Sequence, residues 1–357
     1  MRNVCIIVTS LGGGGAERVA SIQSEILEDL GYNVFLVTVL NHIEYNFKGT
    51  LLNLGLLKDK KDGFFARLGR LFVLKRFLRD NKIDLIIDHR TRSNGIKELL
   101  LKYIVFRSRM IFMIHSINLD NYFSNNKFLS RLIYRKAACM VSVSKSIEVK
   151  VKSIYGLNNV QTIYNPMKKE TTDNSMSIEF NMDYILFFGR LYEKAKDLSF
   201  LISAYKRSTL VSKGIDLVLL GDGPDKLKLK RLVSELDLTE SVIFLEHTKT
   251  PFPYVKNSLF TVLTSFFEGF PMSVIESLAN ETPVVSCNNI SGVGEVIINN
   301  YNGLLVEKSI EVFADALDRM ATDKELLANC KKNCLASIEH LSYENIKNDW
   351  KELLETI

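Results

Sequence analysis

Short apolar runs alternate with longer amphipathic stretches along most of this chain. Runs typical of buried strands cover 4–9, 34–40, 83–88, 110–114, 139–143, 160–164, 184–188, 215–220, 242–245, 259–263 and 284–286. Helical spacing covers 16–30, 63–80, 128–138, 272–280 and 343–357, and further helices start near residues 144, 198 and 251. Strands that alternate with helices predict parallel βαβ units, and therefore an α/β fold.

The length and one polar segment predict two domains. The chain has 357 residues, which is more than a single core usually serves. A polar segment from Asn165 to Asp183 separates the two series of strands. We therefore predict a first domain over 1–168, a second over 183–340, and a final helix over 341–357.

Composition argues against a membrane-spanning, secreted or disulfide-bonded protein. Hydrophobic residues make up 46% of the chain, but charged or amide side chains interrupt every apolar run before it reaches membrane-span length. The first apolar run leads into a glycine loop and is not typical of a signal peptide, so we expect a cytoplasmic protein. Five scattered cysteines without a CxxC pair indicate reduced structural thiols.

Charge favours an anionic partner for the first domain. The net charge is +5, and Lys and Arg outnumber Asp and Glu between Lys58 and Arg109. A lipid surface or a pyrophosphate would suit this excess. Aromatic residues do not interleave with basic ones as a nucleic-acid platform requires, so no nucleic-acid partner is expected.

The segment 264–278 carries the clearest chemistry. Gly269 and Pro271 separate a strand from a helix that starts at the carboxyl end of a parallel sheet, where free N–H groups form an anion site. Glu268 and Glu276 flank that site, and carboxylates accept hydrogen bonds from hydroxyl groups. A ligand with phosphate and polyol parts fits both features, as in a nucleotide sugar; the alternative is a pair of solvated surface acids.

The arrangement Glu268–Gly269–Phe270–Pro271 with Glu276 resembles the retaining glycosyltransferases of family GT4. Further motifs match that family in the same order, namely Gly-Gly-Ala-Glu-Arg (14–18), Ile-Tyr-Asn-Pro (163–166), Phe-Gly-Arg-Leu (188–191), Leu-Gly-Asp-Gly-Pro (220–224), Pro-Phe-Pro-Tyr (251–254), Thr-Pro-Val-Val (282–285) and Asn-Gly-Leu-Leu-Val (302–306). The resemblance implies the GT-B fold, in which two Rossmann-like domains face each other across a cleft and the last helix crosses back to the first domain.

The resemblance also implies a reaction. A hexose or N-acetylhexosamine would pass from a nucleoside diphosphate sugar, expected to be a UDP-sugar, to a glycan acceptor linked to polyprenyl pyrophosphate in bacterial surface polysaccharide assembly. The chain has no Asp-x-Asp motif, so no metal and no separate cofactor are expected. A GT-B-fold UDP-sugar epimerase and a non-catalytic sugar-nucleotide scaffold remain alternatives.

Residue roles follow from the same resemblance. Arg190 and Lys196 would neutralise the departing diphosphate, with Lys194 as the alternative lysine. Glu268 would contact the sugar, and His115 would contact the sugar or its leaving phosphate. Glu276 would accept hydrogen bonds from the ribose. The other donor-binding residues would be Gly13, Gly14, Gly15, Gly189, Gly221, Asp222, His247, Thr248, Gly269, Phe270, Pro271, Met272 and Ser273. Glu17 would lie near the acceptor.

Three features of the first half keep alternatives open. The loop Gly12–Gly15 completes neither a dinucleotide fingerprint nor a P-loop, so a simple tight turn is the alternative to a ligand loop. Arg90 or Arg92, at the end of a strand, could hold an acceptor phosphate. Helix 63–80 is either an ordinary helix packed through Phe64 and its apolar neighbours, with a solvated basic face, or a peripheral contact with anionic lipid.

Overall fold

The computed structural model describes residues 2–167 and 182–357, which form two units. Unit 1 comprises Met1–Pro166 and Tyr343–Ile357, and unit 2 comprises Met167–Ser342. The last helix therefore belongs to unit 1, as the expected return of the chain requires. Most of the predicted linker, residues 168–181, lies outside the described residues.

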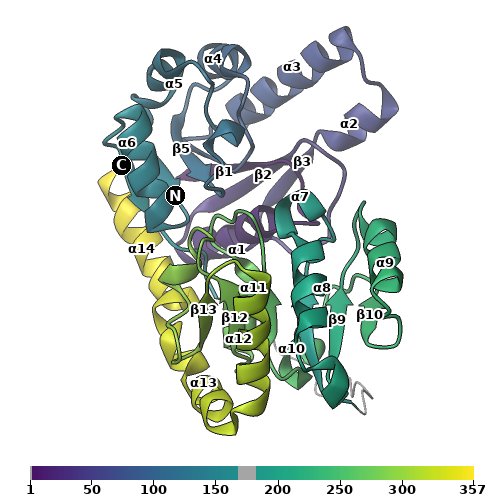
Figure 1. Ribbon diagram of the computed structural model, residues 1–357. Helices are drawn as coiled ribbons and strands as arrows, with labels where there is room; N and C mark the ends of the chain where they lie inside the picture. Colours follow the sequence, from purple (N-terminus) through teal and green to yellow (C-terminus); the bar gives the residue numbers. More distant parts are fainter. Residues whose placement is uncertain (1, 168–181) are drawn as a thin grey trace. The chain divides into compact units, whose positions relative to one another are not determined.

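Unit 1 is built on a parallel sheet (Figure 1). Its strands, among the described residues, are β1 (Asn3–Val8), β2 (Asn33–Thr38), β3 (Thr50–Asn53), β4 (Leu85–Asp88), β5 (Arg109–Ile114), β6 (Cys139–Ser142) and β7 (Val160–Thr162). They pair in the order β3-β2-β1-β4-β5-β6-β7, and each pairing is parallel. The direction of strand succession reverses between β1 and β4, which makes this a doubly wound sheet.

Helices cover both faces of this sheet, with α3, α4 and α5 on one side and α1 on the other (Figure 1). The helices of unit 1 are α1 (Gly15–Asp29), α2 (Gly55–Lys60), α3 (Phe64–Asp80), α4 (Gly95–Ile104), α5 (Lys127–Tyr134), α6 (Lys145–Tyr155) and α14 (Tyr343–Thr356), with a 3₁₀ turn, η1, at Leu119–Asn121. Arg2 donates to the carbonyl of Ile357 and Tyr343 donates to Asp29, so α14 is tied to the start of the unit.

Unit 2 repeats the same principle. Its described strands are β8 (Tyr184–Phe188), β9 (Asp216–Leu220), β10 (Val242–Leu245), β11 (Thr261–Leu263), β12 (Val284–Cys287) and β13 (Gly303–Val306), paired in parallel in the order β10-β9-β8-β11-β12-β13. Its helices are α7 (Glu193–Lys196), α8 (Leu198–Arg207), α9 (Lys226–Glu235), α10 (Phe252–Asn257), α11 (Met272–Ala279), α12 (Ile310–Thr322) and α13 (Lys324–Ser337), with 3₁₀ turns η2 (Val211–Lys213), η3 (Val293–Glu295) and η4 (Glu339–Leu341).

The central strands of both units are buried, apart from the half-buried Asn3 at the start of β1. Four of the six residues of β1 are at most 1% exposed from Cys5 onward, and all of β8 is buried. Because helices cover both faces, these strands are continuously apolar instead of alternating. All five cysteines are buried and none forms a disulfide, as predicted.

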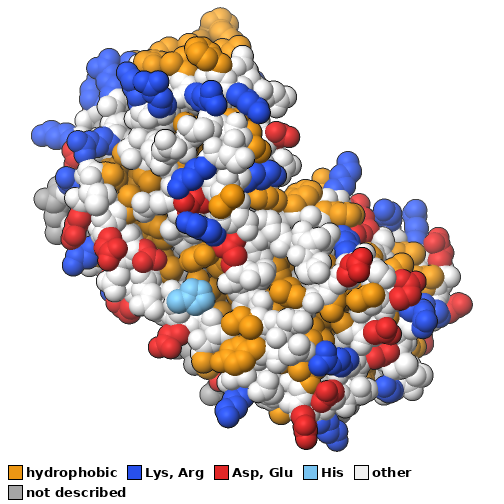
Figure 2. All heavy atoms as spheres, turned by 60° about the vertical axis from the view of Figure 1, so that its left-hand side comes forward, with side chains coloured by type: hydrophobic (Ala, Val, Ile, Leu, Met, Phe, Trp, Pro, Cys, Tyr) orange, Lys and Arg blue, Asp and Glu red, His pale blue; other side chains and the backbone are white. Residues whose placement is uncertain are grey.

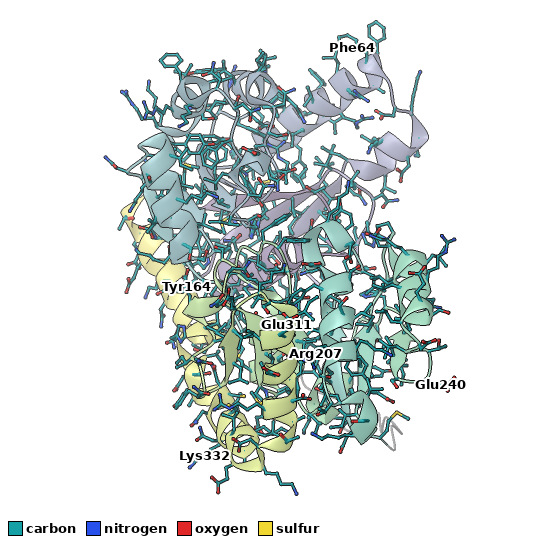
Figure 3. The ribbon with its side chains drawn as sticks, viewed as in Figure 1. Phe64, Tyr164, Arg207, Glu240, Glu311 and Lys332 are labelled. Atoms are coloured by element: carbon teal, nitrogen blue, oxygen red, sulfur yellow. The ribbon has the colours of Figure 1, made fainter. Side chains whose placement is uncertain are left out.

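The structure corrects three expectations. Strands β3 and β13 and helices α2, α4, α7, α12 and α13 were not predicted, and α5 ends at Tyr134 instead of continuing to 138. The apolar residues near the start of α3 do not pack on the sheet: Phe64, Phe65 and Phe72 are 72%, 85% and 70% exposed, and the buried residues of the helix are Leu74 and Leu78. Figure 3 shows Phe64 at the projecting end of α3. No helix in the described part of the chain is long and apolar enough to cross a membrane.

Candidate functional site

The carboxyl ends of β8 and β11 carry the predicted catalytic residues of unit 2. These two strands are neighbours in the sheet, and the strand order reverses between them. Ligands of open α/β sheets bind at such a reversal, outside the carboxyl ends of the strands. Residues 189–197 follow β8 and residues 264–271 follow β11, so Arg190, Lys196 and Glu268 are delivered to this place.

Lys196 and Glu268 form an ion pair there. Lys196 Nζ lies 2.6 Å from Glu268 Oε1, and Ser265 Oγ donates to the same oxygen at 2.7 Å. The lysine side chain is 21% exposed and the glutamate 16%, so both keep access to solvent. An ammonium carries three N–H groups, which leaves Lys196 able to donate to a further acceptor such as a phosphate oxygen. Lys194 is exposed; the geometry therefore favours Lys196 as the phosphate lysine.

Two hydrogen bonds to backbone carbonyls fix these loops against each other. Phe266 N–H donates to Ala195 O at 2.9 Å, and Thr264 Oγ1 donates to Lys196 O at 3.0 Å. Phe266 and Thr264 belong to the loop that carries Glu268, whereas Ala195 and Lys196 belong to the loop that carries Arg190. These hydrogen bonds between the two loops thus help to set the distance between Lys196 and Glu268.

The N-terminus of α11 follows directly on the loop that carries Glu268. Helix α11 starts after Pro271, and no side chain caps it. The first backbone N–H groups of a helix have no partner inside it and carry partial positive charge. By contrast, the N-terminus of α8 is closed by Glu193, whose carboxylate accepts from Leu198 N and Ser199 N at 3.1 Å each. Of these two helices, α11 is therefore the one suited to an anionic ligand.

Close backbone approach explains two glycines around these loops. At Gly221, which has φ +150°, a Cβ atom would lie 2.0 Å from Gly189 O. At Gly292, which has φ +76°, a Cβ atom would lie 2.4 Å from Gly269 O. Any side chain at either position would push apart the loops that surround Arg190 and Glu268.

The other predicted donor residues of unit 2 lie on neighbouring loops. Glu276 is half-buried in α11, one helical turn after Ser273. Asp222 is exposed after β9 and accepts from Gly223 N, while His247 and Thr248 follow β10. Because β9 and β10 continue the sheet beside β8, these residues extend the site along its carboxyl edge.

In unit 1 the glycine loop already holds a carboxylate. Gly13 N–H donates to Glu44 Oε2 at 3.0 Å, at the start of α1. Glu17 lies in the first turn of that helix, and a Cβ atom at Gly14 would lie 2.4 Å from its Oε2. Glu44 lies in a segment that the sequence did not single out, since it follows no motif and stands 31 positions from Gly13. The predicted donor role of Gly13, Gly14 and Gly15 stays a prediction.

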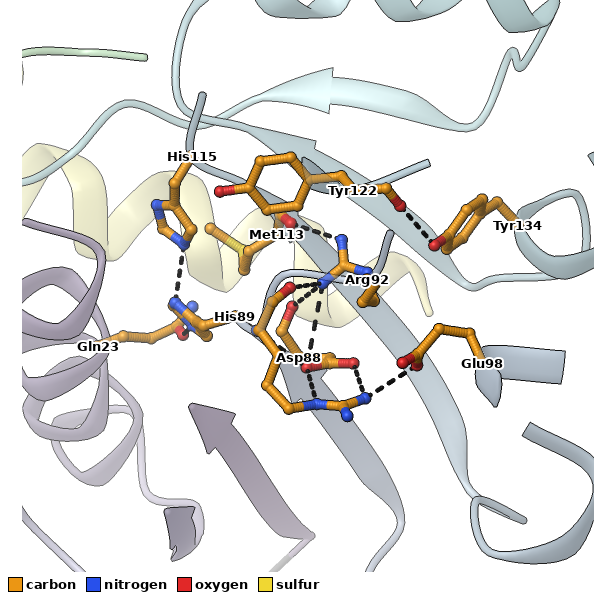
Figure 4. A network of polar contacts seen from close by, with 10 residues as sticks. Gln23, Asp88, His89, Arg92, Glu98, Met113, His115, Tyr122 and Tyr134 are labelled. Carbon is orange, nitrogen blue, oxygen red and sulfur yellow. Dashed lines mark hydrogen bonds and ion pairs between the residues drawn. The ribbon is translucent and has the colours of Figure 1, made fainter. Parts of the chain in front are cut away.

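His115 stands at the end of β5 and is part of a histidine pair (Figure 4). His115 Nε2 lies 3.0 Å from His89 Nδ1, and His89 Nε2 lies 2.5 Å from Gln23 Oε1. Burial, with a further contribution from the charge of Arg92, lowers the pKa of His115 to about 3. Burial followed by the neighbouring His115 and Arg92 lowers the pKa of His89 well below its ordinary value. Both rings are therefore neutral near pH 7, and His115 can serve as a neutral hydrogen-bonding group.

Arg90 and Arg92 are engaged inside unit 1 (Figure 4). Arg90 Nε and Nη2 donate to the two oxygens of Asp88 at 2.9 and 2.7 Å, and Nη2 also reaches Glu98 Oε2 at 3.1 Å. Arg92 is buried and donates to the carbonyls of Asp88, Arg90 and Met113. Burial raises the pKa of Asp88, but the charges of Arg90 and Arg92 outweigh it and hold that pKa below the usual value. This geometry gives both arginines a structural role and does not favour an acceptor-phosphate site.

Within residues 2–167 and 182–357, no group of three or more His, Cys, Asp or Glu side chains is placed to hold a metal ion. Independence from metal remains a prediction.

Comparison with known proteins gives the class of this fold and site. The family model described as "Glycosyl transferases group 1" matches residues 168–335, and "Glycosyltransferase Family 4" matches residues 13–170. The chain belongs to this family of glycosyltransferases.

Relatives and solved structures agree with that class. A Campylobacter jejuni protein named N-acetylgalactosamine-N,N'-diacetylbacillosaminyl-diphospho-undecaprenol 4-alpha-N-acetylgalactosaminyltransferase is 30% identical over 321 residues, covering 86% of each chain. The amylovoran biosynthesis glycosyltransferase AmsD of Erwinia amylovora is 24% identical over 361 residues, covering 99% of this chain and 100% of that one.

Two solved structures show the same fold. TarM of S. aureus, in a complex with UDP, superposes with a TM-score of 0.80 at 14% identity, over 99% of each chain. HepE of Anabaena, in a complex with UDP and glucose, gives 0.79 at 16% identity over 100% of each chain. The predicted GT-B fold of two Rossmann-like units is thereby confirmed.

Proposed function

We propose that this glycosyltransferase moves a hexose or N-acetylhexosamine from a UDP-sugar to a lipid-linked glycan, with retention of anomeric configuration and without a metal ion. The observation that carries the proposal is the ion pair of Lys196 and Glu268 at the strand-order reversal of unit 2, where the loop that carries Glu268 leads directly into the start of α11. Cations and helix amides suit a diphosphate, and a carboxylate suits the hydroxyls of a sugar. The named relatives and both family models are glycosyltransferases, which favours transfer over an epimerase or a scaffold.

Each residue has a physical task in this proposal. Arg190 and Lys196 stabilise negative charge that grows on the diphosphate as the bond to the sugar breaks. Glu268 and the amides of the 269–272 loop hold the sugar hydroxyls, and Glu276 accepts from the ribose. The acceptor hydroxyl attacks the face from which the diphosphate leaves, and its proton passes to the departing phosphate oxygen.

The nature of donor and acceptor rests on the relatives. The TarM and HepE structures are complexes with UDP, and the Campylobacter relative is named for an undecaprenol-linked acceptor. These statements concern those proteins, and we extend them to this chain as a proposal.

A thermal-shift panel of UDP-, GDP- and ADP-sugars tests the donor. We expect a UDP-sugar to give the largest rise in Tm, because only a ligand that binds the native state shifts unfolding. Incubation of that donor with an undecaprenyl-diphosphate glycan, in the presence of EDTA, should then give a product whose anomeric configuration NMR shows to be retained. Inverted product, or turnover of the donor to an isomer without acceptor, would contradict the proposal.

We further propose that unit 1 contacts an anionic membrane through α3 and the neighbouring helices α4 and α5. Beyond the exposed phenylalanines of α3, these two helices expose further apolar side chains, namely Ile96, Leu100, Tyr103, Ile104, Phe128 and Leu132. At the top of Figure 2, exposed hydrophobic side chains form a patch, and Lys and Arg side chains lie beside it. Asp62 pairs with Arg67 and Arg70, and Asp80 with Arg76 and Arg79, so part of the basic charge on α3 is already neutralised.

Sedimentation with vesicles of anionic lipid tests this contact. Burial of an exposed phenylalanine contributes about 2 kcal/mol, so replacing Phe64 and Phe65 by Ser should weaken binding by more than about tenfold. Leu227→Ser, at an exposed position of unit 2, is the matched control. Absence of vesicle binding by the unaltered protein at low salt would contradict the proposed contact.

A further inference from the structure

Lys308 lies in the connection between β13 and α12 and reaches into the junction of the two catalytic loops. Its ammonium is 2.7 Å from Asp197 Oδ2 and donates to Thr264 O at 3.1 Å. The same nitrogen stands 3.9 Å from the centre of the Phe266 ring. The side chains of Lys308 and Asp197 are only 15% and 14% exposed, so the pair is largely protected from solvent.

Its partners are the immediate neighbours of the proposed catalytic residues. Asp197 directly follows Lys196, and Thr264 and Phe266 precede Glu268 on the other loop. Lys308 therefore touches both loops at once, from a third segment of unit 2. No motif of the sequence indicated this residue, because its role depends on contacts more than forty positions away in the chain.

The conformation of Asp197 makes such an anchor useful. Asp197 has φ 50° and ψ 53°, the left-handed region, and closes α7 while it opens α8. A residue other than glycine rarely adopts this backbone conformation unless its surroundings hold it there. The ion pair with Lys308 holds it, and with it the adjacent backbone of Lys196.

We infer that Lys308 is a positioning residue for the diphosphate site, acting through Lys196 and Glu268. This inference rests on the proposed function. Two effects support it: Lys308 ties both loops at a fixed separation, and it neutralises Asp197, whose negative charge would otherwise lower the positive potential beside Lys196. The 2.6 Å contact of Lys196 with Glu268 is the geometry that these two effects maintain.

Calorimetric titration of UDP and of uridine tests the inference. Lys308→Met removes the charge at nearly constant length and should weaken UDP binding by about tenfold, as expected for coupled neighbours, while uridine binding changes by less than about twofold. Lys308→Arg keeps the charge and should stay within about threefold of the unaltered protein. Lys332→Met, at an exposed position of α13 (Figure 3), is the matched control and should change neither affinity.

Three results would overturn the inference. The first is an unchanged UDP affinity in Lys308→Met. The second is an equal loss of affinity for UDP and for uridine, which a general structural role would produce. The third is a Lys308→Arg variant that binds UDP as weakly as Lys308→Met. A double-mutant cycle with Asp197→Gly sharpens the test. Glycine accepts the left-handed conformation without the anchor, so Lys308→Met should cost less UDP affinity in that background, and an undiminished cost would contradict the inference.

A ligand-free measurement separates this inference from the proposed function. Failure of the unaltered protein to bind UDP would refute the donor and leave the geometry of the loops to be tested. A crystal structure of Lys308→Met in which Lys196 and Glu268 have separated would support the positioning role. The pair intact at 2.6 Å in that structure would refute it.

Discussion

Both units place acids and bases at the carboxyl ends of neighbouring parallel strands, but with opposite consequences. In unit 1, Asp88, Arg90 and Glu98 are buried and bonded to one another. In unit 2, Lys196 and Glu268 form one short contact and stay partly open to solvent. Removing one partner of a buried, fully paired set leaves an unpaired charge and destabilises the fold, whereas a partly paired and accessible charge remains able to bind a ligand.

A similar contrast separates two helix N-termini of unit 2. Glu193 closes the N-terminus of α8, whereas Pro271, the N-cap residue of α11, makes no side-chain hydrogen bond to its helix. The carboxylate on α8 shows that the first amides of a helix attract an anion, and α11 offers the same attraction to a ligand. The comparison therefore assigns stability to the charges of unit 1 and chemistry to those of unit 2.

The largest expected effect is on stability, in unit 1. Arg90→Met leaves Glu98 without its ion-pair partner and Asp88 with only the more distant charge of Arg92, at 4.0 Å, and should lower the free energy of unfolding by about 3–5 kcal/mol, measured by urea denaturation. Arg207→Met, at an exposed position of α8, is the control. A loss near that of the control would mean that the buried cluster does not stabilise the fold.

A large effect on activity, without one on stability, is expected in unit 2. Lys196→Met should lower kcat by about 10²–10³-fold, as loss of one preorganised charge does, with little change in Tm. Arg190→Ala or Glu276→Ala should abolish transfer and also leave the protein folded. Lys194→Met serves as the matched control, since Lys194 is exposed two positions away. If Lys194→Met were the inactive variant, the assignment of the phosphate lysine would be wrong.

Acid should destabilise the protein through the histidine pair. The pKa of His115 is about 3 in the native protein, whereas an unfolded histidine titrates near its ordinary value, so the unfolded state binds the extra proton between these values. Stability is thus retained above about pH 6.5 and falls by about 1.4 kcal/mol per pH unit for this residue as the pH drops. In denaturant titrations at several pH values, His115→Asn should make this slope shallower by the share of His115, while His89, whose pKa is also lowered, keeps its own share. An unchanged slope would contradict the buried neutral state; His247→Asn, at an exposed position, is the control.

The smallest effect is expected at an exposed ion pair of unit 2. Lys226 contacts Glu246 at 2.7 Å, but the glutamate side chain is 81% exposed. Glu246→Gln should change the free energy of unfolding by less than about 1 kcal/mol, because water and salt screen such pairs. A loss as large as that of Arg90→Met would remove the distinction between buried and exposed charges.

The sequence predicted most of the fold because local patterns determine it. Strands β8 and β10 have the predicted bounds, and α11 starts after Pro271, as the spacing of apolar residues indicated. Helix α3 shows the limit of such patterns. Its apolar residues satisfy helical spacing, but only Leu74 and Leu78 are buried, since periodicity does not say how far the neighbouring structure extends along a helix.

Long-range contacts account for what the sequence could not provide. The motif around Arg190, Lys196 and Glu268 indicated a common site, and the structure brings Lys196 and Glu268 together. The partners Glu44, His89 and Lys308 belong to no motif and act across wide sequence separations. From the sequence, Arg90 could bind a ligand at a strand end. In the structure it pairs with Glu98, which lies on helix α4, and the sequence did not predict that helix.

A crystal structure of the protein with UDP tests the central claim most directly. We predict that the diphosphate accepts hydrogen bonds from the first backbone amides of α11 and lies within hydrogen-bonding distance of Lys196 Nζ. A diphosphate bound elsewhere, without contact to α11 or Lys196, would contradict the assignment of the chemistry to this edge of unit 2.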